Sequence, residues 1–189
     1  MNKDKLVIDI ETKNTFADVG GRDQVEKLDA SVVGLYSYNR DQYLHFKEGE
    51  FGQLVPYLQN AALVIGFGIN RFDLPVLKKY FDLNVMALPR LDLLEEIELA
   101  YGSRISLDLL AKHNLETRKT AHGLEAVKFY QEGRWEELIS YCLQDVKITK
   151  ELYDLAKEQK FLLIPKKDSD EIIKVALNLP ELILHNSLF

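Results

Sequence analysis

Residues 6–12 read LVIDIET. A continuous apolar run rich in β-branched residues is typical of a buried strand, and here two carboxylates, Asp9 and Glu11, interrupt it. Side chains two residues apart on a strand point to the same side of the sheet. Carboxylates placed side by side on an apolar strand repel each other and lose hydration, at a cost of several kcal/mol. A divalent ion such as Mg²⁺ or Mn²⁺ would offset this cost. The alternative is a strand that ends at Asp9 and leaves Glu11 hydrated in a loop.

The chain has 189 residues, of which 47% are hydrophobic. This size and composition suit one packed domain, or one domain with a short appendage. We expect residues 1–158 to form the domain and residues 159–189 to form a C-terminal extension. The single cysteine, Cys142, excludes an internal disulfide framework and fits a reducing compartment.

The start of the chain and its longest apolar run predict a cytoplasmic protein without a membrane partner. Residues 1–5, MNKDK, lead directly into the first apolar segment, so we expect no signal peptide. The longest apolar run, residues 61–69, is too short to span a bilayer. The net charge of −6 argues against a sequence-independent binder of long duplex DNA, which needs a basic face. It does not exclude an enzyme that takes a strand end into a metal-lined cleft.

The order of apolar segments predicts an α/β fold. Expected strands cover residues 5–10, 31–38, 42–46 and 63–67, with the second and third joined as a hairpin. Residues 12–30 are mostly polar and indicate a long loop. Expected helices cover residues 51–59, 75–81, 91–100, 106–113, 123–131 and 134–157, and residues 84–86 indicate a short edge strand. Three antiparallel strands, a helix, a parallel strand and further helices together predict a ribonuclease H-like mixed sheet flanked by helices.

The pattern changes after the last of these helices. Residues 161–164 and 171–175 are apolar and flank a polar turn, which indicates an appended hairpin. Residues 180–189 are largely apolar. We expect this tail to pack on the domain, on a protein partner or on a second copy of the chain.

Asp73 follows the fourth expected strand, in residues 66–75, GFGINRFDLP. Ligands of open α/β sheets gather at such strand ends, which favours a role in a binding site. The alternative is structural, because aspartate caps helices well and a helix is expected to begin near Pro75.

Tyr141 and Asp145 lie four residues apart on the last expected helix, so their side chains share one face. This places a phenol beside a carboxylate. The alternative is a half-buried tyrosine next to an exposed acid, which is common on amphipathic helices.

The combination is more specific than its parts. An Asp-x-Glu pair on a first strand (Asp9 and Glu11), a Phe-Asp pair after a later strand (ending in Asp73) and a Tyr-x-x-x-Asp motif on a late helix (Tyr141 and Asp145) occur in one order. In this order the chain resembles the DEDD superfamily of 3′–5′ exonucleases, in its tyrosine-bearing DEDDy branch. Residues 122–146, HGLEAVKFYQEGRWEELISYCLQDV, are also similar to stand-alone, ribonuclease H-like predicted exonucleases of bacteria and archaea.

The resemblance implies a role for each acid. Asp9, Glu11 and Asp145 would hold one Mg²⁺ or Mn²⁺ ion, and Asp9 would also bridge to a second ion supported by Asp73. Two such ions can stabilise both the attacking and the leaving oxygen of a phosphodiester displacement. Tyr141 would orient the attacking water, because a phenol of ordinary pKa, about 10, is a poor base at neutral pH.

The resemblance also implies a substrate and a departure from the family. Thr12 and Phe72 would contact the terminal nucleotide of a single-stranded 3′ end, of DNA or RNA. Thr12 could equally be an ordinary strand-end residue, and Phe72 a core residue. The second motif of the family often carries an asparagine where this chain has Gly68, while Asn70 lies two residues later.

The sequence therefore predicts a metal-dependent 3′–5′ exonuclease that releases nucleoside 5′-monophosphates. Two alternatives remain open. One is a structure-specific endonuclease on the same fold, which would release oligonucleotides. The other is a non-catalytic nucleic-acid-binding module, which would not need four acids around one site.

Overall fold

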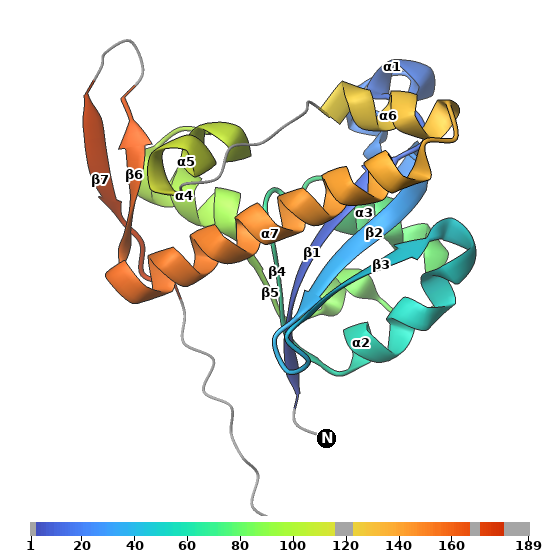
Figure 1. Cartoon of the computed structure of the whole chain (residues 1–189), viewed down its shortest axis with the longest axis horizontal. Coiled ribbons are helices and arrows are strands. Elements are labelled where there is room, and N and C mark those ends of the chain that lie inside the picture. Colours follow the sequence, from blue (N-terminus) through green and yellow to red (C-terminus); the bar gives the residue numbers. More distant parts are fainter. Residues whose placement is uncertain (1–2, 116–122, 167–170, 180–189) are drawn as a thin grey trace, which may run out of the picture.

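A five-stranded mixed sheet lies at the centre of the molecule (Figure 1). The computed structural model describes residues 3–115, 123–166 and 171–179. The sheet has the order β3-β2-β1-β4-β5. Its strands are β1 (Asp4–Thr12), β2 (Ala30–Ser37), β3 (Gln42–Lys47), β4 (Ala61–Gly66) and β5 (Arg90–Asp92). The first three are antiparallel neighbours, and β4 and β5 run parallel to β1. The predicted ribonuclease H-like α/β fold is thus confirmed.

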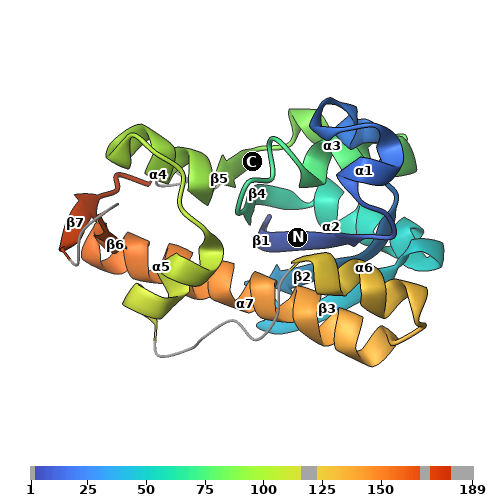
Figure 2. The ribbon, with the colours of Figure 1, turned by 90° about the horizontal axis from the view of Figure 1, so that it is seen from above.

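Helices cover both faces of this sheet (Figures 1 and 2). The α-helices are α1 (Phe16–Val19), α2 (Val55–Gln59), α3 (Asp73–Leu77), α4 (Leu93–Tyr101), α5 (Leu107–Asn114), α6 (Gly123–Gln131) and α7 (Trp135–Gln159). The 3₁₀ helices are η1 (Arg22–Lys27), η2 (Glu48–Leu54), η3 (Lys78–Tyr80) and η4 (Val85–Ala87). None of the helices in the described ranges is long and apolar enough to cross a membrane.

The alternation of side chains along β1 decides which residues face which layer. Leu6, Ile8 and Ile10 pack in the apolar cluster that also contains Leu74 and Leu77 of α3. The odd-numbered side chains of β1 point the other way, toward α7. Since β1 continues to Thr12, the alternative that the strand ends at Asp9 is wrong.

Gly34 allows α7 to lie close to the sheet. Gly34 of β2 pairs with Asp9 of β1. A Cβ atom at Gly34 would lie 2.9 Å from Cys142 Sγ and 2.9 Å from Val146 Cγ2, both on α7. These contacts are shorter than van der Waals contact, so only glycine fits without a shift of the helix. The close approach brings α7 against the carboxylate-bearing end of β1.

Several predicted boundaries are wrong. Residues 84–86 are not an edge strand: η4 forms there, because the Asn84 side chain accepts a hydrogen bond from the Met86 N–H and caps the turn. The edge strand is β5, so the predicted helix at residue 91 begins two residues later, after Asp92. Residues 12–30 contain α1 and η1, and residues 51–59 are divided between η2 and α2.

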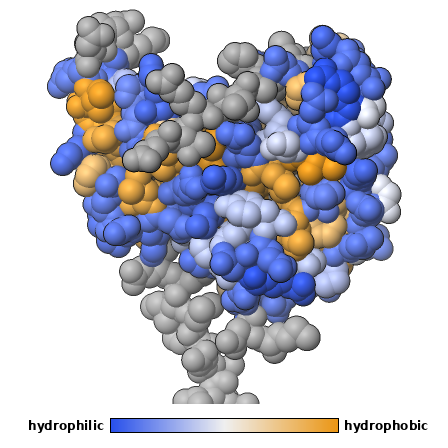
Figure 3. All heavy atoms as spheres, viewed as in Figure 1, coloured by the Kyte–Doolittle hydropathy of each residue, from blue (hydrophilic) through white to orange (hydrophobic). Residues whose placement is uncertain are grey.

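The predicted hairpin after α7 is present. Strands β6 (Phe161–Pro165) and β7 (Ile172–Ala176) pair antiparallel and pack beside α4 and α5. Figure 3 shows apolar side chains gathered over this hairpin, where Ile172 is 49% exposed. The division of the chain at residue 158 stays a prediction. The apolar tail, residues 180–189, lies outside the described residues.

Candidate active site

Three carboxylates from two elements meet at one end of β1. One oxygen each of Asp9, Glu11 and Asp145 lies within 4.8 Å of the other two. Glu11 and Asp145 are 8% and 6% exposed. Oxygens bound to one Mg²⁺ ion at about 2.1 Å are separated by up to about 4.2 Å, so these side chains need little movement to share a divalent ion. The donor set consists only of oxygen atoms, which suits Mg²⁺ or Mn²⁺.

These carboxylates lie on the floor of a cleft of about 1010 Å³. Asp73 and Tyr141 line the same cleft, as do Thr12 and Phe72. All seven residues that the sequence singles out therefore surround one space, although they come from β1, α3 and its preceding loop, and α7.

Tyr141 and Asp145 lie one turn apart on α7, with Cys142 beside them. Tyr141 is 6% exposed and packs in a small cluster with Cys142, Val32 and Leu138. The Cys142 Sγ atom lies 3.7 Å from Asp9 Oδ2. Burial raises the pKa of the Cys142 thiol well above its usual value, and the nearby carboxylates raise it further. Cys142 therefore stays a neutral thiol that fills the space between α7 and β1.

Asp73 is the first residue of α3 and is only 4% exposed. The residue at the N-cap position is Phe72, so the alternative of Asp73 as the helix cap is wrong. Burial raises the pKa of the Asp73 carboxyl to about 7, and the charges of Asp92 and Asp145 add to this effect. A buried carboxyl among other acids is a group whose charged form a cation would stabilise.

Asp92 ties the loop before α3 to the first turn of α4. Its carboxylate accepts hydrogen bonds from the N–H groups of Gly68 at 2.7 Å, Asn70 at 3.0 Å and Leu94 at 3.1 Å. The side chain is 3% exposed. Gly68 has a φ of +84°, a conformation that glycine adopts at little cost. The loop that leads to Asp73 is thus held by one buried carboxylate.

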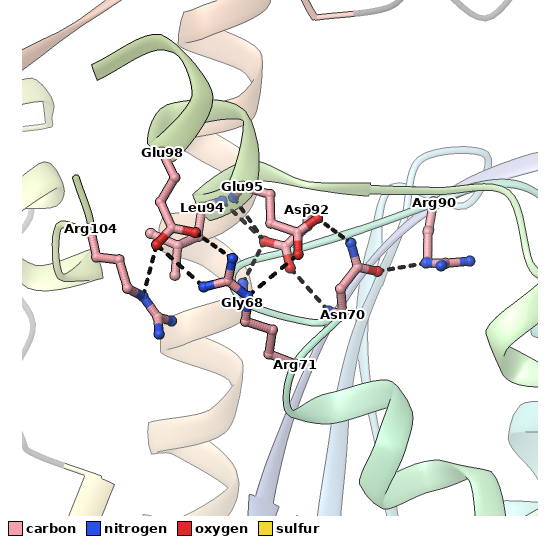
Figure 4. Close-up of polar contacts among 9 residues, drawn as sticks. All are labelled: Gly68, Asn70, Arg71, Arg90, Asp92, Leu94, Glu95, Glu98 and Arg104. Carbon is pink, nitrogen blue, oxygen red and sulfur yellow. Dashed lines mark hydrogen bonds and ion pairs between the residues drawn. The ribbon is translucent and has the colours of Figure 1, made fainter. Parts of the chain in front are cut away.

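Asn70 does not replace the asparagine of the family motif. Its amide donates to Glu95 Oε2 at 2.6 Å and accepts from Arg90 Nε at 2.5 Å (Figure 4). Gly68 lines the cleft, whereas Asn70 is not among the residues that line it. The amide is used to join the loop to α4 and β5.

The two residues predicted to contact the substrate also have structural roles. The Thr12 hydroxyl donates to the Asn14 carbonyl at 2.8 Å. The ring of Phe72 packs edge-on against Phe16 of α1, with centroids 5.8 Å apart. Phe16 lines the cleft as well, so this aromatic pair forms one of its walls. The Cζ atom of Arg22 lies 5.7 Å from the centroid of the Phe16 ring.

Comparison with known proteins decides the family. The model of the RNase_H superfamily matches residues 6–157, which is most of the chain. The chain belongs to the RNase_H superfamily. The match begins at β1 and ends in α7, so it covers every acid of the cleft floor. No curated protein matches this chain.

Solved structures agree on the fold of this RNase_H superfamily member. A family B DNA polymerase from the hyperthermophilic archaeon Pyrobaculum calidifontis is 17% identical, with a TM-score of 0.63 over 82% of this chain and 24% of the polymerase. E. coli Exonuclease I in complex with a 5cy-dT13 oligonucleotide is 15% identical, with a TM-score of 0.55 over 85% of this chain and 41% of the exonuclease. The chain therefore spans less than half the length of each protein.

Sequence reasoning missed the residues at the edge of the cleft beside α4, here called the α4 wall: Arg71, Glu95, Glu98 and Arg104. Arg71 and Arg104 line the cleft, and both contact Glu98 of α4. The helix expected over residues 91–100 would include Asp92 in its first turn, whereas in the structure Asp92 ends β5 and caps α4. A sequence signal was present, because Asp92 directly precedes the apolar pair Leu93-Leu94 at the start of a helical pattern, which is where a capping aspartate is expected.

Proposed function

We propose that this protein is a metal-dependent 3′–5′ exonuclease that hydrolyses phosphodiester bonds of DNA or RNA and releases nucleoside 5′-monophosphates. One observation carries the proposal: the oxygens of Asp9, Glu11 and Asp145 converge within 4.8 Å on the floor of a cleft that Asp73 and Tyr141 also line. The acids occur in the order of the DEDD motifs, and the tyrosine is that of the DEDDy branch.

Each acid has a part in this proposal. Asp9, Glu11 and Asp145 would hold one Mg²⁺ or Mn²⁺ ion, and Asp9 and Asp73 would support a second. When bound, the ions would neutralise charge on the reacting phosphate and lower the pKa of a water molecule. The four carboxylates fix where this positive charge is placed, which is the main requirement of phosphoryl transfer.

Tyr141 would position the nucleophile. Its side chain lies at the cleft, one helical turn before Asp145, and burial at 6% exposure restricts its motion. A phenol hydroxyl in this place can hydrogen-bond a water molecule and aim it at the phosphorus atom. Thr12 and the Phe16–Phe72 pair would contact the last nucleotide, because aromatic rings stack on any base.

The shape of the cleft supports a strand end as the substrate. A volume of about 1010 Å³ accommodates a small number of nucleotides, and the net charge of −6 argues against a sequence-independent binder of long duplex DNA. Exonuclease I, which has the same fold, is described in complex with an oligonucleotide. A single-stranded 3′ end is therefore the proposed partner.

Digestion of end-labelled strands tests the proposal. Single-stranded DNA and RNA carrying a 3′ or a 5′ label would be incubated with Mn²⁺, with Mg²⁺ or with a chelator. We expect a metal-dependent ladder that shortens from the 3′ end and that is absent in Asp9→Ala. Asp82→Ala serves as the matched control, because this carboxylate is not among the residues that line the cleft.

Other results of the digestion experiment would point to a different function. Oligonucleotide products without stepwise shortening would identify an endonuclease instead. Full activity in Asp9→Ala would contradict the proposal. Inactivity of the folded wild-type protein, together with no Mn²⁺ binding by calorimetry in the millimolar range, would favour a non-catalytic nucleic-acid-binding module.

A further inference from the structure

Two arginines from separate segments converge on one carboxylate at the edge of the cleft. Arg71, in the loop before α3, places Nη2 2.9 Å from Glu98 Oε2. Arg104, in the segment between α4 and α5, places Nε 3.2 Å from Glu98 Oε1. Figure 4 shows both guanidinium groups directed at this glutamate. Arg71 and Arg104 are 33 residues apart in the sequence, so it is the tertiary structure that brings them together.

The exposure of the three side chains differs. The side chain of Glu98 is 19% exposed, whereas those of Arg71 and Arg104 are 53% and 56% exposed. Both arginines line the cleft that contains the carboxylate floor. Glu98 is thus the inner anchor, and the guanidinium groups form the outer, solvent-facing part of the cluster.

Arg104 is bound in a way that leaves one end of its guanidinium available. Its ion pair with Glu98 uses Nε. Within the described residues, Nη1 and Nη2 form no hydrogen bond or ion pair. Two parallel N–H donors on a planar group match two oxygens of a phosphate, a geometry that lysine cannot offer.

The acidic residues of the cleft explain why exposed arginines beside it would help to bind a nucleic acid strand. A nucleic acid strand would meet four carboxylates in the cleft, the three of the floor and Asp73, in a protein whose net charge is −6. Metal ions at the floor would offset repulsion only for the phosphate that reacts. Neighbouring phosphates need cations elsewhere along the cleft, and the α4 wall provides them.

We propose that Arg104, held by Glu98 together with Arg71, binds a backbone phosphate of the nucleic acid strand other than the scissile one. This inference rests on the proposed function, since it names the substrate contact of the same cleft. The cluster could instead only brace α4 against the loop before α3. Arg90 separates these two roles, because it belongs to the same polar network through Asn70 but is not among the residues that line the cleft.

Steady-state kinetics on two substrates would test the inference. One substrate is a short thymidine oligonucleotide, and the other is the p-nitrophenyl ester of thymidine 5′-monophosphate, which has a single phosphodiester and no neighbouring phosphate. Arg104→Ala should raise KM for the oligonucleotide about tenfold, the loss expected for a charge-assisted contact. The KM of the ester should rise far less. Arg104→Lys should fall between Arg104→Ala and the wild type, and Arg90→Ala should match the wild type.

Two kinetic results would overturn the inference while the proposed function stands. An unchanged KM for the oligonucleotide in Arg104→Ala would mean that the cluster is only structural. An equal loss on both substrates would mean that Arg104 acts at the scissile phosphate.

Binding measurements keep the inference testable if the wild-type protein cleaves neither substrate and the proposed function fails. Fluorescence anisotropy of a labelled oligonucleotide would then be followed against salt concentration in the wild type, Arg104→Ala and Arg90→Ala. The loss of one phosphate contact should lower the slope of log K against log salt by about 0.7 in Arg104→Ala alone. Equal slopes in all three proteins would overturn the inference.

Discussion

On the floor of the cleft, Asp9, Glu11 and Asp145 bring carboxylate oxygens within 4.8 Å of one another. On the α4 wall, by contrast, Glu95 and Glu98 lie against cations and an amide: Glu95 bonds to the Asn70 side chain, and Glu98 pairs with two arginines. Both regions are rich in acids, and both line or border the same cleft.

This difference indicates that the floor is a binding site, whereas the acids of the α4 wall support its structure. Acids gathered against one another cost folding free energy unless a cation joins them, so the floor is arranged for binding rather than for stability. Acids matched with donors and cations fix the position of a wall. Substitutions on the floor should therefore change the reaction, whereas substitutions on the wall should change substrate binding or stability.

The largest expected effect belongs to Asp145→Asn. The amide keeps the shape of the side chain but removes one charged metal ligand, which should cost several kcal/mol of transition-state stabilisation. We expect kcat/KM on a labelled single strand to fall by about 10³-fold. In the presence of a chelator, the midpoint of thermal unfolding should not fall, because the change relieves repulsion among the acids.

Glu98→Gln is the matched change on the wall. It should affect KM more than kcat, because Glu98 holds Arg71 and Arg104 rather than a metal. A loss of kcat in Glu98→Gln as large as that in Asp145→Asn would contradict the assignment of the floor to the reaction and of the α4 wall to substrate binding.

The next effect is on stability, in Asp92→Ala. Asp92 is 3% exposed and accepts hydrogen bonds from Gly68, Asn70 and Leu94. Its removal leaves the buried N–H groups of Gly68 and Leu94 without this acceptor and removes the cap of α4. We expect unfolding by urea to show a loss of about 2–4 kcal/mol.

Ser106→Ala is the control for capping alone. The Ser106 hydroxyl caps α5 by accepting from the Leu109 N–H at 3.3 Å, at an exposed position. Its loss should cost about 1 kcal/mol or less. If Asp92→Ala costs no more than Ser106→Ala, then the bonds from Asp92 to the loop before α3 add nothing to stability.

The floor could be predicted from the sequence because its residues sit in short local patterns. Asp9 and Glu11 share a strand face, and Tyr141 and Asp145 share a helix face, so spacing alone brings each pair together. Their meeting across the fold followed from the family motifs, and the structure places them in one cleft with Asp73.

The wall could not be predicted in this way. Arg71, Glu98 and Arg104 lie in three segments whose contact depends on where α4 ends and how the chain turns into α5. The sequence interpretation also placed the edge strand at residues 84–86 instead of β5, which hid the role of Asp92. Ion pairs between side chains of separate segments leave no periodic pattern, so only the tertiary structure reveals them.

The smallest expected effect concerns the distance between α7 and the sheet. Gly34→Ala places a Cβ atom 2.9 Å from both Cys142 Sγ and Val146 Cγ2. Overpacking of this kind costs about 1–3 kcal/mol, part of which is relieved by a shift of the helix. Because α7 carries Tyr141 and Asp145, such a shift should move the floor as well. We expect both a lower unfolding free energy and a kcat that falls at temperatures where the variant is fully folded.

Gly52→Ala is the matched control, since a Cβ atom there meets nothing within 4 Å. It should change neither the unfolding free energy by more than about 0.5 kcal/mol nor the activity. If Gly34→Ala lowers stability but leaves kcat unchanged in the folded protein, then the floor tolerates a displacement of α7. In that case the position of the acids would depend on β1 and the metal ions more than on the packing of the helix against β2.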